Sequence, residues 1–384
     1  MQDARLNDFD PQVRKEALQA LVARAEADPG LYAPEIEAVN MHCHTFHSYN
    51  GYGYSPTALA WLGKTKGFQA MGIVDFDVLD GVDEFLDACE IVGLRGSAGL
   101  ETRVYVPEFA DREINSPGEP GICYQMGLGF CSSKATGKAA EILADLRQRA
   151  ENRNRGLLAR VNAHLHPTAI DYEADVLPLT PGGNATERHM LTAYVASAER
   201  AFPVTPQRAT FWADRLDMQP EQVEALMGDV PAFKNVIRAK LMKRGGVGYV
   251  QPGPETFPSV DQLHEMVTLL GALPCFTWLD GTSEGESAIE ELLSSMIDKG
   301  AAAVNIVPDR NWNVADPEVK AIKVRNLYQI VELAQRNDLP LNVGTEMNKA
   351  GLKLVDDFDA PELAPVRQAF LDGASFVYGH TVAQ

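Results

Sequence analysis

The chain has 384 residues, of which 45% are hydrophobic and 23% are charged, so it can bury a large core and is too long for one small module. Its formal net charge of −19 disfavours a nucleic-acid partner, because binding a phosphate backbone requires a clustered positive surface. Its five cysteines are scattered and form no Cys-x-x-Cys pair, which indicates neither a disulfide framework nor a structural zinc site.

The N-terminal stretch MQDARLNDFDPQVRKEALQ has no basic region followed by an apolar core, and no later apolar run approaches the length of a membrane span. We therefore expect no membrane partner. Scattered cysteines, read as reduced thiols, favour a cytoplasmic location. The oligomeric state is left open by the sequence.

The first predicted element is a helix. Asp10 and Pro11 have the form of an N-cap followed by proline at the first helical position, and apolar residues then recur at helical spacing as far as about Ala27. We interpret residues 1–35 as an N-terminal helical extension.

Seven short apolar runs follow, and amphipathic stretches separate most of them. The runs are IEAVNMH, QAMGIVDF, SAGLETRVYV, ICYQMGLGF, LPCFTWL, AAAVNIV and LPLNVGTE. Strands that alternate with helices this often predict an α/β protein with a parallel barrel or sheet, here over residues 36–384. Between the fourth and fifth runs the pattern is mostly helical, which predicts a helical insertion over about 141–245.

Polar residues collect at the carboxyl ends of the predicted strands, which is the edge where parallel α/β barrels place their chemistry. His42 and His44 are two residues apart, so on a strand they point to the same face and could bind one ion together. Asp75 and Glu101 would add oxygen ligands from the next two strands. Further polar residues at such ends are Asp77, Arg103, Asp280, Asp309, Glu346 and Asn348.

Other interpretations of these residues exist. A histidine near a strand end is commonly a hydrogen-bonded structural residue, and acidic residues there commonly cap the next helix. The metal hypothesis is favoured for His42, His44 and Glu101 because three donors coincide at one predicted edge. We expect His47 to be a loop residue and His164 to lie in a helix without a catalytic role.

Several stretches resemble the PHP superfamily, the polymerase and histidinol phosphatase family of metal-dependent phosphoesterases. MHCHTFHSYNGYGYSPTALAWLGKTKGFQAMGIVDFDVLDG is similar to its His-x-His-Thr motif and the strand that follows, SAGLETRVYV to the strand with its bridging Glu, and GGNATERHMLTAYV to the insertion segment that presents a His. SVDQLHEMVTLLGALPCFTWLDG and LPLNVGTEMN resemble its last two motifs. The resemblance implies a distorted (β/α)7 TIM-like barrel that binds up to three metal ions.

The ligands that this resemblance implies are only partly present. The positions that match are His42, His44, Asp75, Glu101 and His189. Asn50 stands near an expected Asp, and Phe76, Trp278 and either Tyr124 or Gln125 stand where histidines are usual, while Glu346 and Asn348 replace a final Asp and His. Because the side chains of Phe and Trp cannot bind a divalent ion, we expect one or two ions of Zn²⁺, Mn²⁺ or Fe²⁺. The expected ligands are His42, His44 and Glu101 with Asp75 or Glu346.

The favoured hypothesis is a metal-dependent hydrolase, a phosphoesterase acting on a small organic phosphate. In it Asp75, His189 and Arg103 are the candidate catalytic residues, and the candidate substrate contacts are Trp278, Tyr124, Arg188 and Lys349. Phosphate binding could use Arg103, Arg188, Arg310 or Lys349. The alternatives are a single-metal lyase or isomerase on a sugar-like substrate, and a catalytically inactive homologue that binds a ligand or has a structural role.

Overall fold

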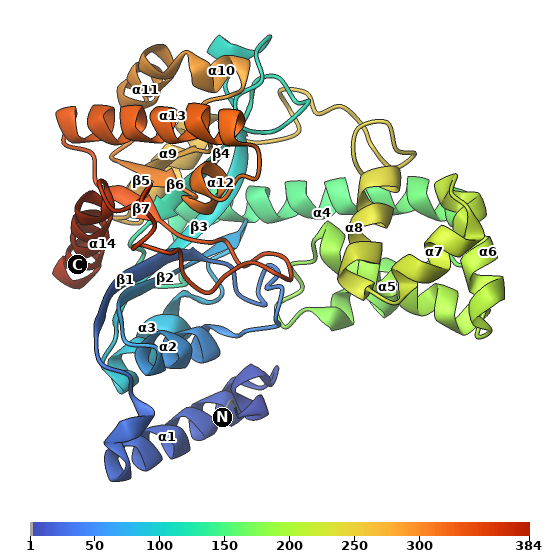
Figure 1. Ribbon diagram of the computed structural model, residues 1–384, viewed down its shortest axis with the longest axis horizontal. Coiled ribbons are helices and arrows are strands. Elements are labelled where there is room, and N and C mark those ends of the chain that lie inside the picture. Colours follow the sequence, from blue (N-terminus) through green and yellow to red (C-terminus); the bar gives the residue numbers. More distant parts are fainter. Residues whose placement is uncertain (1–2) are drawn as a thin grey trace. The chain divides into compact units, whose positions relative to one another are not determined.

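Seven strands form one sheet in chain order in the computed structural model, which describes residues 3–384 (Figure 1). They are β1 (Ile36–Cys43), β2 (Phe68–Phe76), β3 (Arg95–Tyr105), β4 (Ile122–Leu128), β5 (Leu273–Trp278), β6 (Ala303–Ile306) and β7 (Leu341–Val343). A parallel bridge between Cys43 and Glu346 brings the first strand beside the segment that follows the last one. The sheet is therefore a nearly closed barrel, which agrees with the TIM-like barrel predicted from the sequence.

One strand departs from the expected parallel arrangement. β4 runs antiparallel to both β3 and β5, whereas the other neighbouring strands are parallel. The segment between β3 and β4 contains the single 3-10 turn η3 (Pro107–Phe109) and no helix that could carry the chain back across the sheet. A parallel pair needs such a crossover, so the expectation of an all-parallel sheet is wrong at β4.

The chain divides into two compact units, a barrel unit (residues 3–146 and 257–384) and a helical insertion (residues 147–256). The helices of the barrel unit are α1 (Pro11–Ala27), α2 (Pro56–Thr65), α3 (Val82–Val92), α9 (Val260–Leu269), α10 (Glu284–Ser287), α11 (Ile289–Asp298), α12 (Asp309–Trp312), α13 (Pro317–Arg336) and α14 (Arg367–Ala383), with the short turns η1 (Ala4–Asn7) and η2 (Pro29–Leu31). None of the helices within residues 3–384 is long and apolar enough to cross a membrane.

The insertion contains most of α4 (Gly137–Leu165), which begins in the barrel unit. Its other helices are α5 (Glu187–Ala201), α6 (Thr205–Leu216), α7 (Pro220–Met227) and α8 (Val230–Leu241), with the turns η4 (Tyr172–Val176) and η5 (Leu177–Leu179). It has its own hydrophobic core, in which the rings of Trp212 and Phe233 meet edge to face with centroids 5.6 Å apart.

Local sequence signals explain where helices begin. The side chain of Asp10 accepts a hydrogen bond from the backbone N–H of Gln12, with Pro11 at the first helical position of α1. Ser55 and Pro56 repeat this arrangement at α2. A short polar N-cap satisfies an N–H that has no partner within the helix, and proline has the φ angle that the first turn requires.

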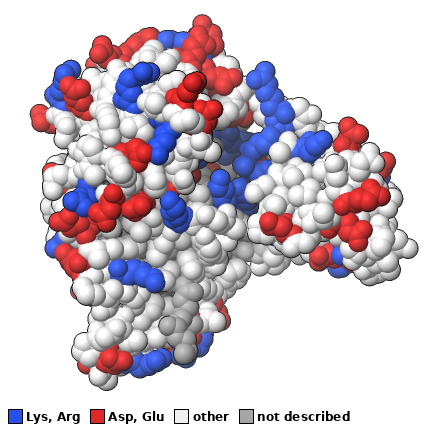
Figure 2. Space-filling view, in the orientation of Figure 1, with Lys and Arg blue, Asp and Glu red and all other residues white. Residues whose placement is uncertain are grey.

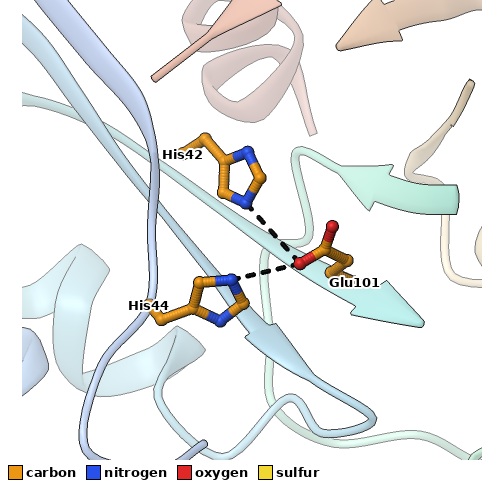
Figure 3. A group of neighbouring side chains, drawn as sticks. All are labelled: His42, His44 and Glu101. Atoms are coloured by element: carbon orange, nitrogen blue, oxygen red, sulfur yellow. Dashed lines mark ion pairs between the residues drawn. The ribbon is translucent and has the colours of Figure 1, made fainter. Parts of the chain in front are cut away.

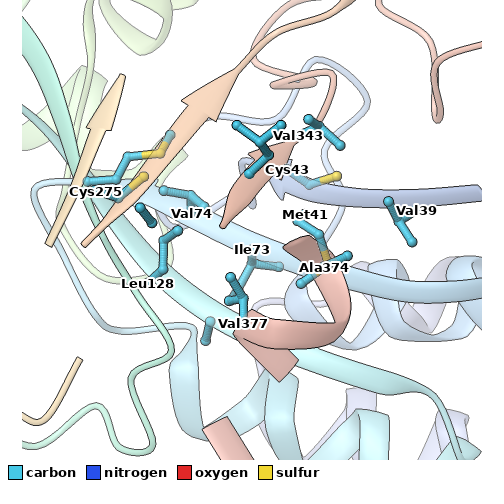
Figure 4. Close-up of a cluster of buried hydrophobic side chains, with 14 of the residues drawn as sticks. Val39, Met41, Cys43, Ile73, Val74, Leu128, Cys275, Val343, Ala374 and Val377 are labelled. Carbon is cyan, nitrogen blue, oxygen red and sulfur yellow. The ribbon is translucent and has the colours of Figure 1, made fainter. Parts of the chain in front are cut away.

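Strand β1 has two different faces, and this difference positions the site. Val39, Met41 and Cys43 are buried in the hydrophobic core, and Ala374 and Val377 of α14 belong to the same cluster (Figure 4). Because side chains alternate along a strand, His42 and His44 point to the opposite face. The core packing of one face thus fixes the direction of the two histidines on the other.

Candidate metal centre

Three side chains form a buried cluster of potential metal ligands. His42 on β1, His44 directly after the end of β1 and Glu101 on β3 each offer one ligand atom, and these atoms lie within 4.8 Å of one another (Figure 3). Glu101 Oε2 is 3.6 Å from Nε2 of His42 and 3.1 Å from Nε2 of His44. The exposed fractions of the residues are 0%, 0% and 3%. Two imidazoles and a carboxylate are a donor set that suits zinc, manganese or iron.

The tautomer of His44 follows from its other ring nitrogen. Nδ1 of His44 lies 3.1 Å from Oγ of Ser48, and the Ser48 hydroxyl donates its single hydrogen to Oδ1 of Asp75 at 2.6 Å. Ser48 must therefore accept a hydrogen bond from Nδ1–H of His44. In the neutral ring, Nε2 then carries a lone pair that faces Glu101.

This arrangement calls for a cation. The lone pair of His44 Nε2 and the carboxylate oxygen of Glu101 are both acceptors, and two acceptors 3.1 Å apart repel each other unless a proton or a metal ion lies between them. His44 Nε2, His42 Nε2 and Glu101 Oε2 are all buried without a hydrogen-bond partner. Buried polar atoms are normally satisfied, so the three donors fit a divalent ion.

The surroundings of Glu101 favour the ionised form of its carboxyl group. Burial raises the pKa of the Glu101 carboxyl, but His42 and His44, which in the metal-free site can carry protons on Nε2 and donate them to Glu101, outweigh burial through hydrogen bonding and charge and lower that pKa to about 2. Burial raises the pKa of the Cys275 thiol, and the negative charge of Glu101 raises it further. The carboxylate thus stays ionised, which is the state that binds a metal ion.

Asp75 lies behind His44. Its Oδ1 accepts hydrogen bonds from the backbone N–H of Thr45 and from Ser48, and its Oδ2 accepts one from the Thr45 hydroxyl at 2.6 Å. Asp75 is not among the three donors that lie within 4.8 Å of one another. The structure therefore places it where it orients His44 through Ser48.

The side-chain amide of Asn40 holds β1 against the segment that follows β7. Asn40 Nδ2 donates to Thr345 Oγ1 at 2.8 Å and to the carbonyl of Leu354 at 2.7 Å, while Asn40 Oδ1 accepts from the backbone N–H groups of His42 and Thr345. Gly344 must be glycine here, because a Cβ would lie 2.3 Å from Asn40 Oδ1 and 2.4 Å from the His42 nitrogen. These contacts fix the backbone of His42.

Glu346 follows β7, and its backbone forms hydrogen bonds with the backbones of both histidines. Its N–H donates to the carbonyl of His42 and its carbonyl accepts from His44 N–H, both at 2.8 Å. Its φ of 62° is a conformation that non-glycine residues adopt rarely. Its carboxylate accepts two hydrogen bonds from Arg310, at 3.0 and 3.1 Å. Glu346 lies outside the three-donor cluster, and its carboxylate is paired with Arg310.

Phe76 and Trp278, the aromatic residues at two of the positions where the resemblance implies histidines, differ in their relation to the cluster. The ring of Phe76 packs beside that of His44, with centroids 4.1 Å apart. Trp278 is fully buried, and the alternation of β5 puts it on the opposite face from Cys275 and Thr277. The register of β3, β4 and β5 places Cys275 on the same face of the sheet as Glu101. Cys275 therefore faces the cluster, and Trp278 does not.

Other candidate residues from the sequence are spread over both units. Arg103 donates to Glu119 at 2.8 Å, and its guanidinium lies 5.9 Å from the ring of Tyr124. Lys349 is exposed in the loop after Glu346. His164 is on α4 of the insertion, where Nε2 lies 2.8 Å from the carbonyl of Arg215.

His189 and Arg188 belong to the insertion, at the start of α5. Nδ1 of His189 accepts a hydrogen bond from the backbone N–H of Thr186, so His189 forms part of the cap of its own helix. Burial lowers the pKa of His189 to about 4, with a smaller contribution from the charge of Lys234. Arg188 donates to Asn235 at 2.6 Å.

Sequence reasoning missed Ser48 and a row of neutral polar residues. Thr277, Asn305 and Asn342 pair in register across β5, β6 and β7, on the same face as Cys275. Each is buried and has a polar atom without a hydrogen-bond partner, namely Thr277 Oγ1, Asn305 Nδ2 and Asn342 Oδ1. The sequence feature that could have identified this row is a single polar residue at an equivalent position inside each of the three apolar runs.

Comparison with known proteins gives a likeness at the level of the fold. No protein-family model matches the chain, and no curated protein matches it. The structure is similar to an amidohydrolase from Chromobacterium violaceum, determined with bound sulfate and no metal, at 14% identity and a TM-score of 0.56 over 87% of this chain and 96% of that one. It is also similar to a candidate metal-dependent phosphoesterase from Bifidobacterium adolescentis, at 19% identity and a TM-score of 0.53 over 87% of this chain and 98% of that one.

Proposed function

We propose that the protein is a metal-dependent hydrolase related to the PHP superfamily, and that it cleaves a phosphoester of a small organic molecule. The observation that carries the proposal is the pair of acceptors, His44 Nε2 and Glu101 Oε2, held 3.1 Å apart in a buried site. Of the two solved structures with this fold, the amidohydrolase supports hydrolysis in general, and the candidate metal-dependent phosphoesterase supports hydrolysis of a phosphoester.

In this proposal His42, His44 and Glu101 hold the ion. When bound, a divalent ion supplies a Lewis acid that activates water and polarises the bond to be cleaved. Asp75 and Ser48 keep His44 in the tautomer whose Nε2 is free to bind. Phe76 packs against the His44 ring. Three protein ligands leave coordination positions open for substrate.

Arg310 is the residue that we propose to contact the phosphate. Its side chain is 46% exposed, yet its guanidinium reaches Glu346 at 3.0 Å. The charge of Glu346, and more weakly those of Tyr124 and Glu101, raises the pKa of Arg310, so the guanidinium lies within electrostatic range of the cluster. A planar guanidinium binds phosphate through two parallel hydrogen bonds.

The test is a panel of small phosphomonoesters and phosphodiesters, assayed by phosphate or alcohol release with protein loaded with Zn²⁺, Mn²⁺ or Fe²⁺. Glu101→Gln keeps the size of the side chain and removes its charge, so it serves as the matched inactive control. We expect release by wild type and none above background by Glu101→Gln. No release by wild type with any of the three metals, or equal release by both proteins, would contradict the proposal.

A second candidate is supported by the neutral polar row. Thr277, Asn305 and Asn342 offer hydroxyl and amide groups on the cluster's face of the sheet, and such groups suit the hydroxyls of a sugar-like substrate. A single-metal lyase or isomerase would use them. The two candidates differ in product, because an isomerase or lyase converts an unphosphorylated polyhydroxy acid without releasing phosphate.

A further inference from the structure

The turn that follows His44 connects the metal centre with a distant part of the chain. Toward the metal centre, Ser48 donates to Asp75 and accepts from His44. Phe46 lies between His44 and Ser48 in the chain, and its ring packs against the N-terminal segment, defined as residues 3–14, which contains η1 and the first turn of α1. One short turn therefore contacts both the metal ligand and this segment.

Phe46 is the point of contact between the turn and the N-terminal segment. It is buried, and the ring of Phe9 meets its ring edge to face, with centroids 5.6 Å apart and planes at 82°. The guanidinium carbon of Arg14 lies over the same ring, 5.1 Å from its centroid. An edge-to-face aromatic pair and a cation over an aromatic ring are both attractive arrangements. Phe9 and Arg14 therefore both stabilise the position of Phe46.

Arg14 is itself held firmly in place. Charged side chains are scattered over the visible face of the protein in Figure 2, whereas Arg14 is only 3% exposed. A buried charge requires a partner. The guanidinium forms two parallel hydrogen bonds with the carboxylate of Glu84 on α3, one of them at 2.8 Å, and donates to the carbonyl of Asp8 at 2.6 Å. Glu84 also accepts from the hydroxyl of Thr57 on α2 at 2.7 Å. These contacts fix the plane of the guanidinium against Phe46.

The loop that begins with this turn is attached to the same segment at its other end. Ser55, the N-cap of α2, donates its hydroxyl hydrogen to the carbonyl of Leu6, and its backbone N–H donates to Oδ1 of Asn7 at 2.9 Å. Leu6 is buried in the core of the barrel unit. The N-terminal segment therefore holds the loop between β1 and α2 at both Phe46 and Ser55.

A small movement of the turn would reach the metal ligand. Ligand sites tolerate displacements of about 0.5 Å before their geometry is lost. The hydrogen bond between His44 and Ser48 is 3.1 Å long, near the upper end of the usual range, so it has little room to stretch. Support for Phe46 is therefore also support for the orientation of His44.

We propose that the N-terminal segment is a positioning element of the metal centre, and that Phe9 and Arg14 raise its metal affinity by holding Phe46 and, through it, the turn that carries Ser48. The proposal rests on the metal centre of the proposed function and adds to that centre a part of the chain outside the barrel sheet. Phe9 and Arg14 are positioning residues, because they act through Phe46 and not on the ion itself.

The first test compares the Zn²⁺ affinity of full-length variants by competition with a chelating dye, in protein shown to be folded by circular dichroism. Phe9→Ala should weaken zinc binding by about two- to tenfold, the effect of one edge-to-face aromatic pair on an equilibrium constant. Phe9→Tyr keeps the ring and should bind zinc like wild type. Phe376→Ala is the matched control, because Phe376 on α14 is 53% exposed and Phe9 is 48% exposed, and it should also bind zinc like wild type.

Arg14→Gln removes both the cation over Phe46 and the ion pair with Glu84. It should weaken zinc binding by about tenfold, the lower end of the range for groups that support a metal ligand. Arg24→Gln changes an exposed arginine on the same helix and should leave the affinity unchanged. If Arg14→Gln does not fold, Phe9→Ala decides the question, because it leaves the ion pair in place.

The second test uses wild type and relies on the reciprocity of coupling. If the segment increases metal affinity, bound metal must stabilise the docked segment by the same factor. Hydrogen exchange of the backbone amides of residues 3–14 should therefore slow by about two- to tenfold on addition of zinc. The amides of α13 report any general stabilisation by zinc. Slowing in the segment that does not exceed the slowing in α13 would show that the segment and the metal centre are not coupled.

The outcomes separate this proposal from the hydrolase proposal. Unchanged zinc affinity in folded Phe9→Ala and Arg14→Gln, or equal weakening in Phe376→Ala, overturns the positioning role and leaves the hydrolase proposal standing. Weaker zinc binding by the two variants, in a protein that hydrolyses no phosphoester, gives the reverse result. If wild type binds no zinc, the metal centre is absent and both proposals fail.

Discussion

The hydroxyl oxygen of Ser48 lies 3.1 Å from Nδ1 of His44, on the opposite edge of the ring from Glu101. Since the Ser48 hydrogen is donated to Asp75, this contact decides which nitrogen of His44 carries the proton. The site therefore depends on a residue that binds no metal. Groups that orient a ligand in this way influence metal affinity almost as strongly as the ligands themselves.

Ser48→Ala should weaken metal binding by about 10- to 100-fold, the range for loss of such a supporting group. The fold should remain, because alanine fills most of the same volume. The measurement is a competitive titration of Zn²⁺ against a chelating dye. Ser287→Ala, which removes an exposed hydroxyl bonded within its own helix, is the matched control and should bind metal like wild type. Equal affinity of Ser48→Ala and wild type would show that Ser48 does not orient His44.

Metal stoichiometry is expected to be one ion per chain, because only His42, His44 and Glu101 come together among the described residues 3–384. His42→Ala and Glu101→Gln should each lose the ion. His164→Ala should keep it, since His164 contacts the carbonyl of Arg215 in the insertion, and should cost about 1 kcal/mol of unfolding free energy. Elemental analysis of desalted protein gives the answer. Three retained equivalents, or full metal in folded His42→Ala, would contradict the assignment.

Much of the fold could be predicted from the sequence, because its signals are local. All seven apolar runs form strands, and the helix predicted from Asp10 and Pro11 begins at Pro11 and ends at Ala27. The direction of β4 could not be predicted, since an apolar run has the same pattern in parallel and antiparallel pairs. The insertion predicted over about 141–245 corresponds to a compact unit of residues 147–256.

The candidate site was predictable only where spacing along the chain determines geometry. His42 at the end of β1 and His44 directly after it point to the same side, as two-residue spacing along an extended chain requires. The bridge from Asp75 through Ser48 to His44 joins a strand end to a loop 27 residues earlier, and no periodicity encodes such a contact. The same holds for Arg310 and Glu346, which are 36 residues apart and meet through an ion pair.

Asn40→Ala should destabilise the protein by about 2–4 kcal/mol, because each buried partner left without a hydrogen bond costs about 1–3 kcal/mol. Asn40 is fully buried and joins β1 to the Thr345 hydroxyl and to the carbonyl of Leu354. Urea unfolding followed by circular dichroism measures the change. Asn313→Ala removes an exposed amide that bonds to Asp309 and should change stability by less than about 0.5 kcal/mol. If both variants unfold at the same urea concentration as wild type, Asn40 does not hold the barrel closed.

Stability should fall as the pH is lowered from about 6.5 to 4, and His189 should account for part of the fall. Burial lowers the pKa of His189 to about 4 in the folded protein, whereas an unfolded histidine titrates near its model value of 6.5. Within this window the unfolded chain binds the proton and the folded chain does not, so each step toward acid favours unfolding. The full effect of such a difference is about 3 kcal/mol, since one pKa unit corresponds to about 1.4 kcal/mol.

His189→Gln keeps a side-chain acceptor for the Thr186 N–H and cannot titrate, so the difference in unfolding free energy between wild type and His189→Gln should shrink as the pH falls from 7 to 4.5. Denaturant unfolding at the two pH values measures this difference for each protein. A gap between the two proteins that stays constant would mean that His189 is protonated, or open to water, in the folded state.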